Sequence, residues 1–531
     1  MTIVAAELEF QKETMDLSDS SGMWHQLWQP RGRRLILFSV FIFAFGLTLY
    51  NGKILSPERG DPAMWDYMAE SIVRGQVPYR DVVELKTPLP AYMSALAIVV
   101  GRAAGINELI AIRYVGIILA CLLLVAVFAV TEAYTNSRLA ALIAILAPLS
   151  VERFYSWGAT GTEPKISMIL FGLLSLLLIS KNKPFWAGAA SMLSCLCWQP
   201  GLMFTGVAVL MFCDYLRNWR DRRAVKAMAG AAIPLVVVVL YFYHAGALRD
   251  LWAWCFWFDL TVYAVDIHRS LPEQINHIAG VTYRVLGKTG IILLAAGALG
   301  YITVLIGKLR KRRTGDAAGH TPPGAAPIGA LLIPPAIYVA YWRFDFNSGP
   351  YLIPIVPFAA IFAGWLVSRW IMLIPSRSQE PDKRPVICRE YAGLVGVALF
   401  TVVAVATSAG TKYRDTTLGD EYAALEPLRS ILLPEDKIWA QGEVNILVLL
   451  DRPSVSKHIW FDRGKDDFAA AEKPGGFQQV LAEIDAQQPR FVEMGRIETV
   501  HHSAELEAWL AEKYKPLPTL SFEVYERYRE R

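Results

Sequence analysis

The first apolar run of the chain, RGRRLILFSVFIFAFGLTLY at Arg31–Tyr50, decides the class of fold. It places three arginines just before an uncharged stretch that begins at Leu35. About 20 apolar residues are enough for a helix to cross a bilayer, and this stretch comes close to that length. No small-residue cleavage site follows it, which predicts an uncleaved anchor preceded by a cytoplasmic segment, residues 1–34.

The whole chain shares the apolar character of this run. Of its 531 residues, 54% are hydrophobic and 19% are charged, whereas soluble domains average about 45–50% apolar and about 25% charged residues. This composition excludes a disordered protein and a nucleic-acid binder driven by basic charge. Together with the grouping of the apolar residues into runs, it predicts a polytopic α-helical membrane protein.

The direction in which these runs cross follows from the basic side chains, since cytoplasmic loops carry an excess of Lys and Arg. If the ambiguous run 89–100 stays at the surface, the later basic loops lie on the cytoplasmic side; if it crosses, they lie outside. We therefore predict about eleven spans, with run 89–100 at the outer surface and the C-terminus outside. Beyond Leu35–Tyr50, the predicted spans lie near 110–130, 138–151, 165–180, 184–198, 201–215, 227–244, 288–307, 327–342, 351–370 and 390–409.

The last part of the chain, residues 411–531, has a different character from the transmembrane domain predicted at 35–410. The formal net charge of the chain is +4, but acidic residues outnumber basic ones in this last part. Alternating strand and helix patterns predict a small extracytoplasmic α/β domain. Strands are expected at 437–440, 446–450, 456–460 and 490–493, and helices at 422–431, 476–486 and 504–513.

Cysteine and histidine usage gives no strong sign of a metal or disulfide centre. The chain has six cysteines, and because none lies in 51–104 or in 411–531, we expect no disulfide framework. Cys195 and Cys197 fit buried small hydrophobic residues. His501 and His502 are metal-ligand types, but without a Cys or Asp partner pattern they are typical of exposed loop residues.

The first outer loop, residues 51–104, is too long to be a simple connector. Asp61-Pro62 provides a favoured N-cap and a favoured first helical residue, and Gly75 is expected to end that helix. Glu70 and Arg74 are spaced as an ion pair on it, and we expect Asp66 and Glu70 on a solvated face. A second helix follows Pro88, and both helices are predicted to lie in the membrane interface.

Charged residues of this loop suggest chemistry at the water–lipid boundary. A carboxylate there is suited to act as a general base toward an acceptor hydroxyl, and Lys86 is suited to hold a phosphate as a point charge. Two plainer interpretations stay open: Asp61 caps a helix and nothing more, and Lys86 is a snorkelling or headgroup-binding lysine.

The loop also resembles a known family. The series Asp61, Gly75, Pro78-Tyr79, Asp81 and Lys86-Thr87-Pro88-Leu89 is similar to the first-loop signature of GT-C superfamily glycosyltransferases. The nearest in pattern are bacterial protein O-mannosyltransferase-like enzymes and the lipid A aminoarabinose transferase, of the glycosyltransferase family 39 type. The chain departs from this pattern at Pro62, where relatives have Glu, and at Thr87, where they have Pro. Weaker similar patches are Thr162-Glu163-Pro164, Trp198-Gln199-Pro200, where relatives often have Lys, and Gly349–Leu352, which lacks the family's His.

The resemblance implies a polyprenyl-phosphate-sugar donor and a lipid, glycan or protein acceptor on the outer face of a bacterial cytoplasmic membrane. It implies no certain cofactor, a possible role for a divalent cation, and no nucleic-acid partner. It assigns catalysis to Asp61 as general base and to Glu163, which would position the acceptor or support Asp61. Substrate binding is expected of Lys86 as the phosphate contact, and of Tyr79, Asp81, Gln199 and Arg269.

Two other functions compete with this one. A transporter or flippase of a lipid-linked solute also has many spans, but it predicts charged or broken helices at mid-membrane, whereas most acidic residues here cluster in outer loops. A catalytically inactive GT-C scaffold that binds glycolipid is the second alternative, which Pro62 and Trp198 favour. The aromatic loop 245–287 fits either sugar binding or an interfacial aromatic belt.

Overall fold

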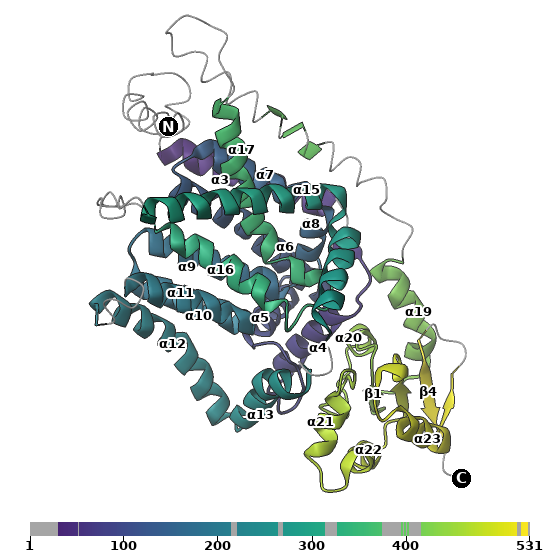
Figure 1. Cartoon of the computed structure of the whole chain (residues 1–531). Helices are drawn as coiled ribbons and strands as arrows, with labels where there is room; N and C mark the ends of the chain where they lie inside the picture. The colour runs from purple at the N-terminus through teal and green to yellow at the C-terminus, as the bar shows by residue number, and fades with distance from the viewer. Residues whose placement is uncertain are drawn as a thin grey trace, which may run out of the picture.

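The fold consists of a large helical bundle and a smaller C-terminal domain packed against one end of it (Figure 1). The computed structural model describes residues 30–50, 53–213, 220–263, 269–313, 327–373, 395–396, 398–399, 401–402, 416–517 and 522–528. Residues 1–29 of the predicted cytoplasmic segment 1–34, and most of the predicted span 390–409, lie outside the described residues.

The bundle contains most of the predicted apolar runs as helices. Among the described residues, four helical stretches are long and apolar enough to cross a membrane: Glu108–Thr135, Arg222–His244, Leu271–Arg310 and Gly349–Leu373. The total of eleven spans stays a prediction. The helices of the bundle are α3 (Pro30–Tyr50), α6 (Glu108–Thr135), α7 (Arg138–Leu149), α8 (Glu152–Gly158), α9 (Pro164–Ser180), α10 (Pro184–Cys197), α11 (Leu202–Phe212), α12 (Arg222–His244), α15 (Leu271–Arg313), α16 (Ile328–Tyr341) and α17 (Ile355–Leu373).

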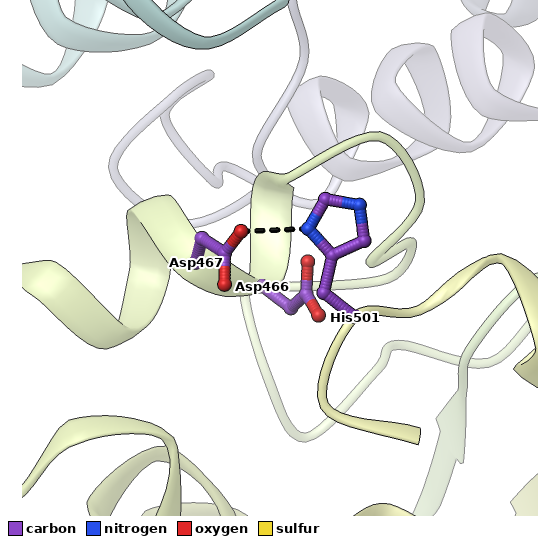
Figure 2. A group of neighbouring side chains, drawn as sticks. All are labelled: Asp466, Asp467 and His501. Atoms are coloured by element: carbon purple, nitrogen blue, oxygen red, sulfur yellow. Dashed lines mark hydrogen bonds and ion pairs between the residues drawn. The ribbon is translucent and has the colours of Figure 1, made fainter. Parts of the chain in front are cut away.

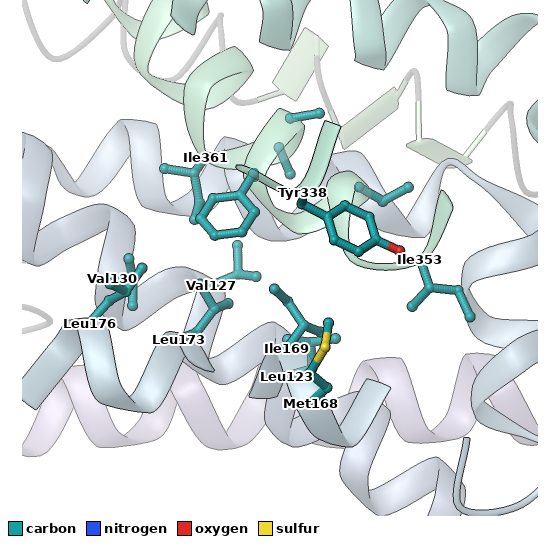
Figure 3. Close-up of a cluster of buried hydrophobic side chains, with 14 of the residues drawn as sticks. Leu123, Val127, Val130, Met168, Ile169, Leu173, Leu176, Tyr338, Ile353 and Ile361 are labelled. Carbon is teal, nitrogen blue, oxygen red and sulfur yellow. The ribbon is translucent and has the colours of Figure 1, made fainter. Parts of the chain in front are cut away.

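The core of the bundle lies where α6, α9, α16 and α17 meet (Figure 3). Leu123 and Val127 of α6 interlock there with Leu173 of α9 and Ile361 of α17, all of them buried. By contrast, α12 leaves a broad apolar surface uncovered, and Val237 is 62% exposed. Since water-soluble proteins seldom leave large apolar patches uncovered, this face fits contact with lipid.

Two helices of the bundle approach each other closely at glycines. On α10 and α12, a Cβ at Gly188 would lie 1.8 Å from the Ala227 carbonyl oxygen, and one at Gly230 would lie 1.9 Å from that of Phe185. Small residues allow such backbone contact, which drives helix association in membranes. The longest helix, α15, is broken at Gly287, whose φ of 61° is left-handed, and the predicted span 288–307 begins directly after this break.

Both helices predicted within residues 51–104 are present, as α4 (Asp61–Val73) and α5 (Leu89–Ala103); their position in the membrane interface stays a prediction. The expectation that Asp61 caps α4 is wrong: Gly60 is the N-cap, and Asp61 is the first helical residue with no capping hydrogen bond. Glu70 and Arg74 form the expected ion pair at 2.9 Å. The expected solvated face is also wrong, because Asp66 and Glu70 are buried; α4 packs between α5 and the C-terminal domain.

The C-terminal domain is built on a four-stranded mixed sheet with strand order β1-β2-β4-β3. Strands β1 (Ile438–Ala440) and β2 (Phe491–Glu493) are parallel, and β4 (Val524–Arg527) runs antiparallel to both β2 and β3 (Tyr514–Pro516). The helices are α19 (Leu418–Ile431), α20 (Asn445–Leu450), α21 (Lys465–Ala471), α22 (Gly476–Ala486) and α23 (Ser503–Lys513), with a single turn η8 (Ile497–Thr499).

The sequence predictions for this domain are confirmed for two strands, β1 and β2, and for the helices α19, α22 and α23. The predicted strand 446–450 is wrong, because these residues form the buried helix α20 against α4. A short apolar run has no periodicity that separates a buried strand from a buried helix. The predicted strand 456–460 is irregular chain, and β3, β4 and α21 were not predicted.

Candidate active site

The loop that joins α4 to α5 presents Lys86 on a backbone held from three directions. Its main-chain oxygen accepts a 2.7 Å hydrogen bond from the Tyr79 hydroxyl and a 3.2 Å one from the Cys255 thiol. The Gln199 amide donates at 2.6 Å to the oxygen of Leu85. Tyr79 and Gln199, both predicted to bind substrate, therefore contact the backbone that carries Lys86.

A tight turn places Tyr79 in this position. Tyr79 has a φ of 70°, which is rare for a residue with a side chain, and its amide donates to the Val82 oxygen at 2.7 Å. The Asp81 carboxylate accepts from the Val77 amide at 2.7 Å and pairs with Arg80, and this Arg80 hydrogen bond lowers the pKa of Asp81. Asp81, predicted to bind substrate, thus has its carboxylate engaged in the turn.

The Thr87 departure from the family pattern also has a structural role. Its hydroxyl donates a 3.0 Å hydrogen bond to the main-chain oxygen of Cys195, near the end of α10. A proline at this position has no such donor. Thr87 therefore ties the Lys86 loop to the bundle.

Acidic side chains surround the Lys86 ammonium. Burial lowers the pKa of Lys86, whereas Asp259, Tyr263, Asp345 and Glu84 raise it. The second effect is larger, so the pKa of Lys86 lies above its ordinary value. Asp259 and Tyr263 belong to a π-helical turn, η5 (Asp259–Tyr263), and π-helical turns are frequent at functional sites. Burial raises the pKa of Asp259 to about 7, against the opposing effect of Lys86. Nearby acidic groups therefore keep Lys86 in its charged form, which is the form that binds a phosphate.

A second lysine, which is buried, lies near the same aromatic side chain, Trp198. Lys165 pairs with Glu163 at 3.1 Å, with both side chains buried. The Lys165 ammonium lies 4.9 Å from the Trp198 ring centroid and 5.3 Å from that of Tyr351, while the Lys86 ammonium is 5.8 Å from Trp198. Trp198, which stands where relatives often have Lys, thus lies between two lysines from other parts of the chain, with favourable cation–π geometry.

Asp61 lies at the exposed N-terminus of α4, close enough to influence this cluster. Its charge contributes to raising the pKa of Glu84 and of Arg463. Within the described ranges, its carboxylate has no hydrogen-bond partner. Asp61 is therefore open to a substrate hydroxyl, whereas Glu163 is buried and occupied by Lys165.

The structure adds residues that the sequence did not single out. Asp345 accepts a hydrogen bond from Tyr341, and its other carboxylate oxygen is buried without a partner. From the C-terminal domain, Arg463 donates to the Tyr263 hydroxyl at 3.2 Å. The predicted Arg269 has a buried guanidinium nitrogen, Nη1, without a partner in the described structure. No local pattern marks Asp345 or Arg463, because they reach the site only through folding.

Two hollows flank the cluster. One is a small space of about 10 Å³, lined by Trp65, Tyr79, Glu84, Lys86 and Pro164, among others. The other is an apolar groove of about 310 Å³ between α11 and α16, and it is lined by Leu202, Met203, Val207, Ile337, Tyr338 and Tyr341, among others.

The apolar groove leads to the charged cluster through its tyrosines. Tyr341 bonds Asp345 and lies edge-on to Trp198 with ring centroids 6.1 Å apart. An apolar groove next to a cluster of charged side chains has the chemistry of a site for a lipid with an anionic head. Possible metal ligands lie elsewhere among the described residues: Asp466, Asp467 and His501 in the C-terminal domain.

Comparisons with known proteins identify one matching family model and solved structures with a similar fold. The family model for DolP-mannose mannosyltransferase matches residues 75–241, a range that contains Tyr79, Lys86, Glu163 and Gln199. ArnT from Cupriavidus metallidurans bound to undecaprenyl phosphate superposes with a TM-score of 0.59 at 13% identity, covering 94% of this chain and 98% of that one. Its apo structure gives 0.57 at 12% identity, with 93% and 98% covered. No curated protein sequence matches significantly.

The chain therefore has the GT-C fold, in its ArnT-like form, and the resemblance inferred from the first outer loop is confirmed. The likeness extends over nearly the full length of both chains, C-terminal domain included.

Proposed function

We propose that the protein is a membrane glycosyltransferase that moves a sugar from a polyprenyl-phosphate donor to an acceptor on the outer face of the cytoplasmic membrane. The observation that carries the proposal is the grouping of an apolar groove, the half-buried Lys86 and the buried Lys165 near Trp198, and an open carboxylate, Asp61. Each of these parts corresponds to one part of the reaction: the lipid chain, the phosphate and the acceptor hydroxyl.

The donor is assigned to the groove and to the lysines. The polyprenyl chain would lie between α11 and α16, and its phosphate would contact Lys86 as a replacement for Asp259. The unpartnered Arg269 nitrogen is a further phosphate contact. Undecaprenyl phosphate bound to the similarly folded ArnT supports this class of donor.

The reaction is a displacement at the anomeric carbon of the sugar. Asp61 takes the proton of the acceptor hydroxyl while the oxygen of that hydroxyl forms the new glycosidic bond with the anomeric carbon. The bond between the anomeric carbon and the phosphate oxygen breaks, and polyprenyl phosphate leaves with its charge stabilised by Lys86. Glu163 takes part indirectly: as the buried partner of Lys165, it positions that ammonium beside Trp198.

The acceptor is a lipid, glycan or protein of the cell envelope, and the sugar is a hexose or a pentose. The outer location rests on the excess of basic residues in the loops assigned to the cytoplasm. The chemistry assigned here requires no metal, although a divalent cation is compatible with the acidic groups around Lys86.

The experiment uses the full chain in detergent with undecaprenyl-phosphate-linked hexoses and pentoses and an envelope extract as acceptor. The wild type is expected to release undecaprenyl phosphate and to label the extract. Lys86→Met is expected to lose donor binding, and Lys473→Met, in an exposed pair with Glu483, serves as control.

Other outcomes identify the competing functions. Intact donor binding without release would favour the inactive scaffold. Movement of uncleaved donor across proteoliposomes would favour a flippase. Either result would overturn the proposal.

A further inference from the structure

A compact group of metal-ligand side chains lies in the C-terminal domain. Asp466 and Asp467 open helix α21, and His501 lies in the turn between η8 and α23 (Figure 2). One ligand atom from each of the three lies within 4.8 Å of the others. The group thus joins two chain segments that are more than 30 residues apart.

One carboxylate oxygen in the group is buried without a hydrogen-bond partner among the described residues. Asp466 is 0% exposed, and its Oδ2 atom accepts a 2.8 Å hydrogen bond from the His502 amide. Its Oδ1 atom is buried with no hydrogen-bond partner among the described residues. Burying a carboxylate oxygen without a partner is costly, so this atom calls for a cation that the protein itself does not provide.

A plainer interpretation explains only part of the group. His501 Nδ1 lies 2.7 Å from Asp467 Oδ2, and this contact alone is a common surface pair. It leaves the Oδ1 atom of Asp466 unpartnered. His502, 3.1 Å from Asp467 and 2.8 Å from Glu505, flanks the group as outer-shell partners flank metal sites.

We propose that Asp466, Asp467 and His501 bind a divalent transition-metal ion of the Zn²⁺ or Mn²⁺ type. One imidazole nitrogen with two carboxylate oxygens suits these ions, whereas Ca²⁺ takes six to eight oxygen ligands. Asp467 and His501 are about half exposed, which gives the ion a path from solvent and leaves coordination positions for water.

The ion fixes the helix that faces the candidate active site. Phe468 of α21 packs on Trp254 and Phe258, at ring-centroid distances of 4.8 and 5.4 Å. Arg463, just before α21, donates to Tyr263. Metal binding at the start of α21 therefore stabilises the contact between the C-terminal domain and the loop that carries Asp259. Metal binding does not require transferase activity, so this site can be tested independently of the proposed reaction.

The test measures metal uptake by the full-length protein in detergent after treatment with EDTA. The stripped protein is titrated with ZnCl₂ and, separately, with MnCl₂, and bound metal and the melting temperature are recorded. We expect about one ion per chain and a rise in melting temperature, since a ligand that binds only the folded state stabilises it. Asp466→Asn and His501→Gln are each expected to weaken binding at least tenfold.

Glu483→Gln, which changes an exposed carboxylate of the same domain, is the matched control and should bind as the wild type does. If Asp466→Asn does not fold, His501→Gln decides, because that side chain is 47% exposed. Wild-type protein that takes up neither ion, or a His501→Gln variant with unchanged uptake, would overturn the site.

Discussion

The hydroxyl of Tyr79 donates a 2.7 Å hydrogen bond to the main-chain oxygen of Lys86. Tyr79 is completely buried at a positive φ, a conformation that costs on the order of 1–3 kcal/mol and persists only where the surroundings enforce it. The sequence suggested Tyr79 as a substrate contact. Its position makes it a positioning residue for the lysine assigned to the donor phosphate.

Tyr79→Phe removes this hydrogen bond and keeps the ring. A typical hydrogen bond contributes about 1 kcal/mol, so we expect the protein to fold and the Kd for undecaprenyl phosphate to rise about fivefold. Binding can be measured by titration in detergent. Tyr243→Phe, at an exposed ring on α12, is the control. An unchanged Kd in Tyr79→Phe would refute the positioning role.

Asp61→Asn tests the general base. Because Asp61 makes no capping hydrogen bond, the asparagine side chain of the variant should leave α4 intact. Loss of the base should lower kcat about 10²–10⁴-fold, while donor binding stays as in the wild type. Glu512→Gln, an exposed change in α23, controls for charge. A variant that transfers sugar at the normal rate would remove Asp61 from the mechanism.

Donor binding should depend on pH near neutrality because of Asp259. Its pKa is raised to about 7, so the carboxyl is mostly charged at pH 8 and mostly neutral at pH 6. Charged Asp259 competes with the phosphate for Lys86, and binding should therefore strengthen as the pH falls through 7.

The size of this effect can be separated from the ionisation of the phosphate itself by comparison with Asp259→Asn. We expect the wild type to bind undecaprenyl phosphate about threefold to tenfold more weakly than Asp259→Asn at pH 8, and about equally at pH 6. Parallel pH profiles for the two proteins would contradict the role of Asp259.

Glu163→Gln removes one partner of a buried ion pair. The Lys165 ammonium would stay buried without its carboxylate, and such changes cost about 3–5 kcal/mol. We expect a clear drop in thermal stability, measured by unfolding in detergent. The double variant Glu163→Gln, Lys165→Met should recover most of the stability without recovering turnover. If it also recovers turnover, Lys165 has no part in the reaction.

How far the sequence predicts this protein depends on how local each signal is. The loop from Asp61 to Leu89 is one short stretch, so the helix start near Asp61-Pro62, the lysine and the family resemblance could be read from the sequence, although Gly60 and not Asp61 is the N-cap. The same locality caused the errors: Asp66 and Glu70 had a solvated pattern, but tertiary packing around α4 buries both. The run 446–450 gave no periodic signal and was assigned to a strand instead of a helix.

By itself, the sequence predicted a helical membrane protein that resembles the GT-C type, and it singled out Asp61 and Lys86 as candidate site residues, because hydropathy and short motifs are local properties. Only the tertiary structure decided which groups surround Lys86. Asp259, Asp345 and Arg463 come from distant segments and carry no motif. Their charges act through space in a low-dielectric interior, where a few ångströms decide the strength of an interaction and sequence separation has no influence.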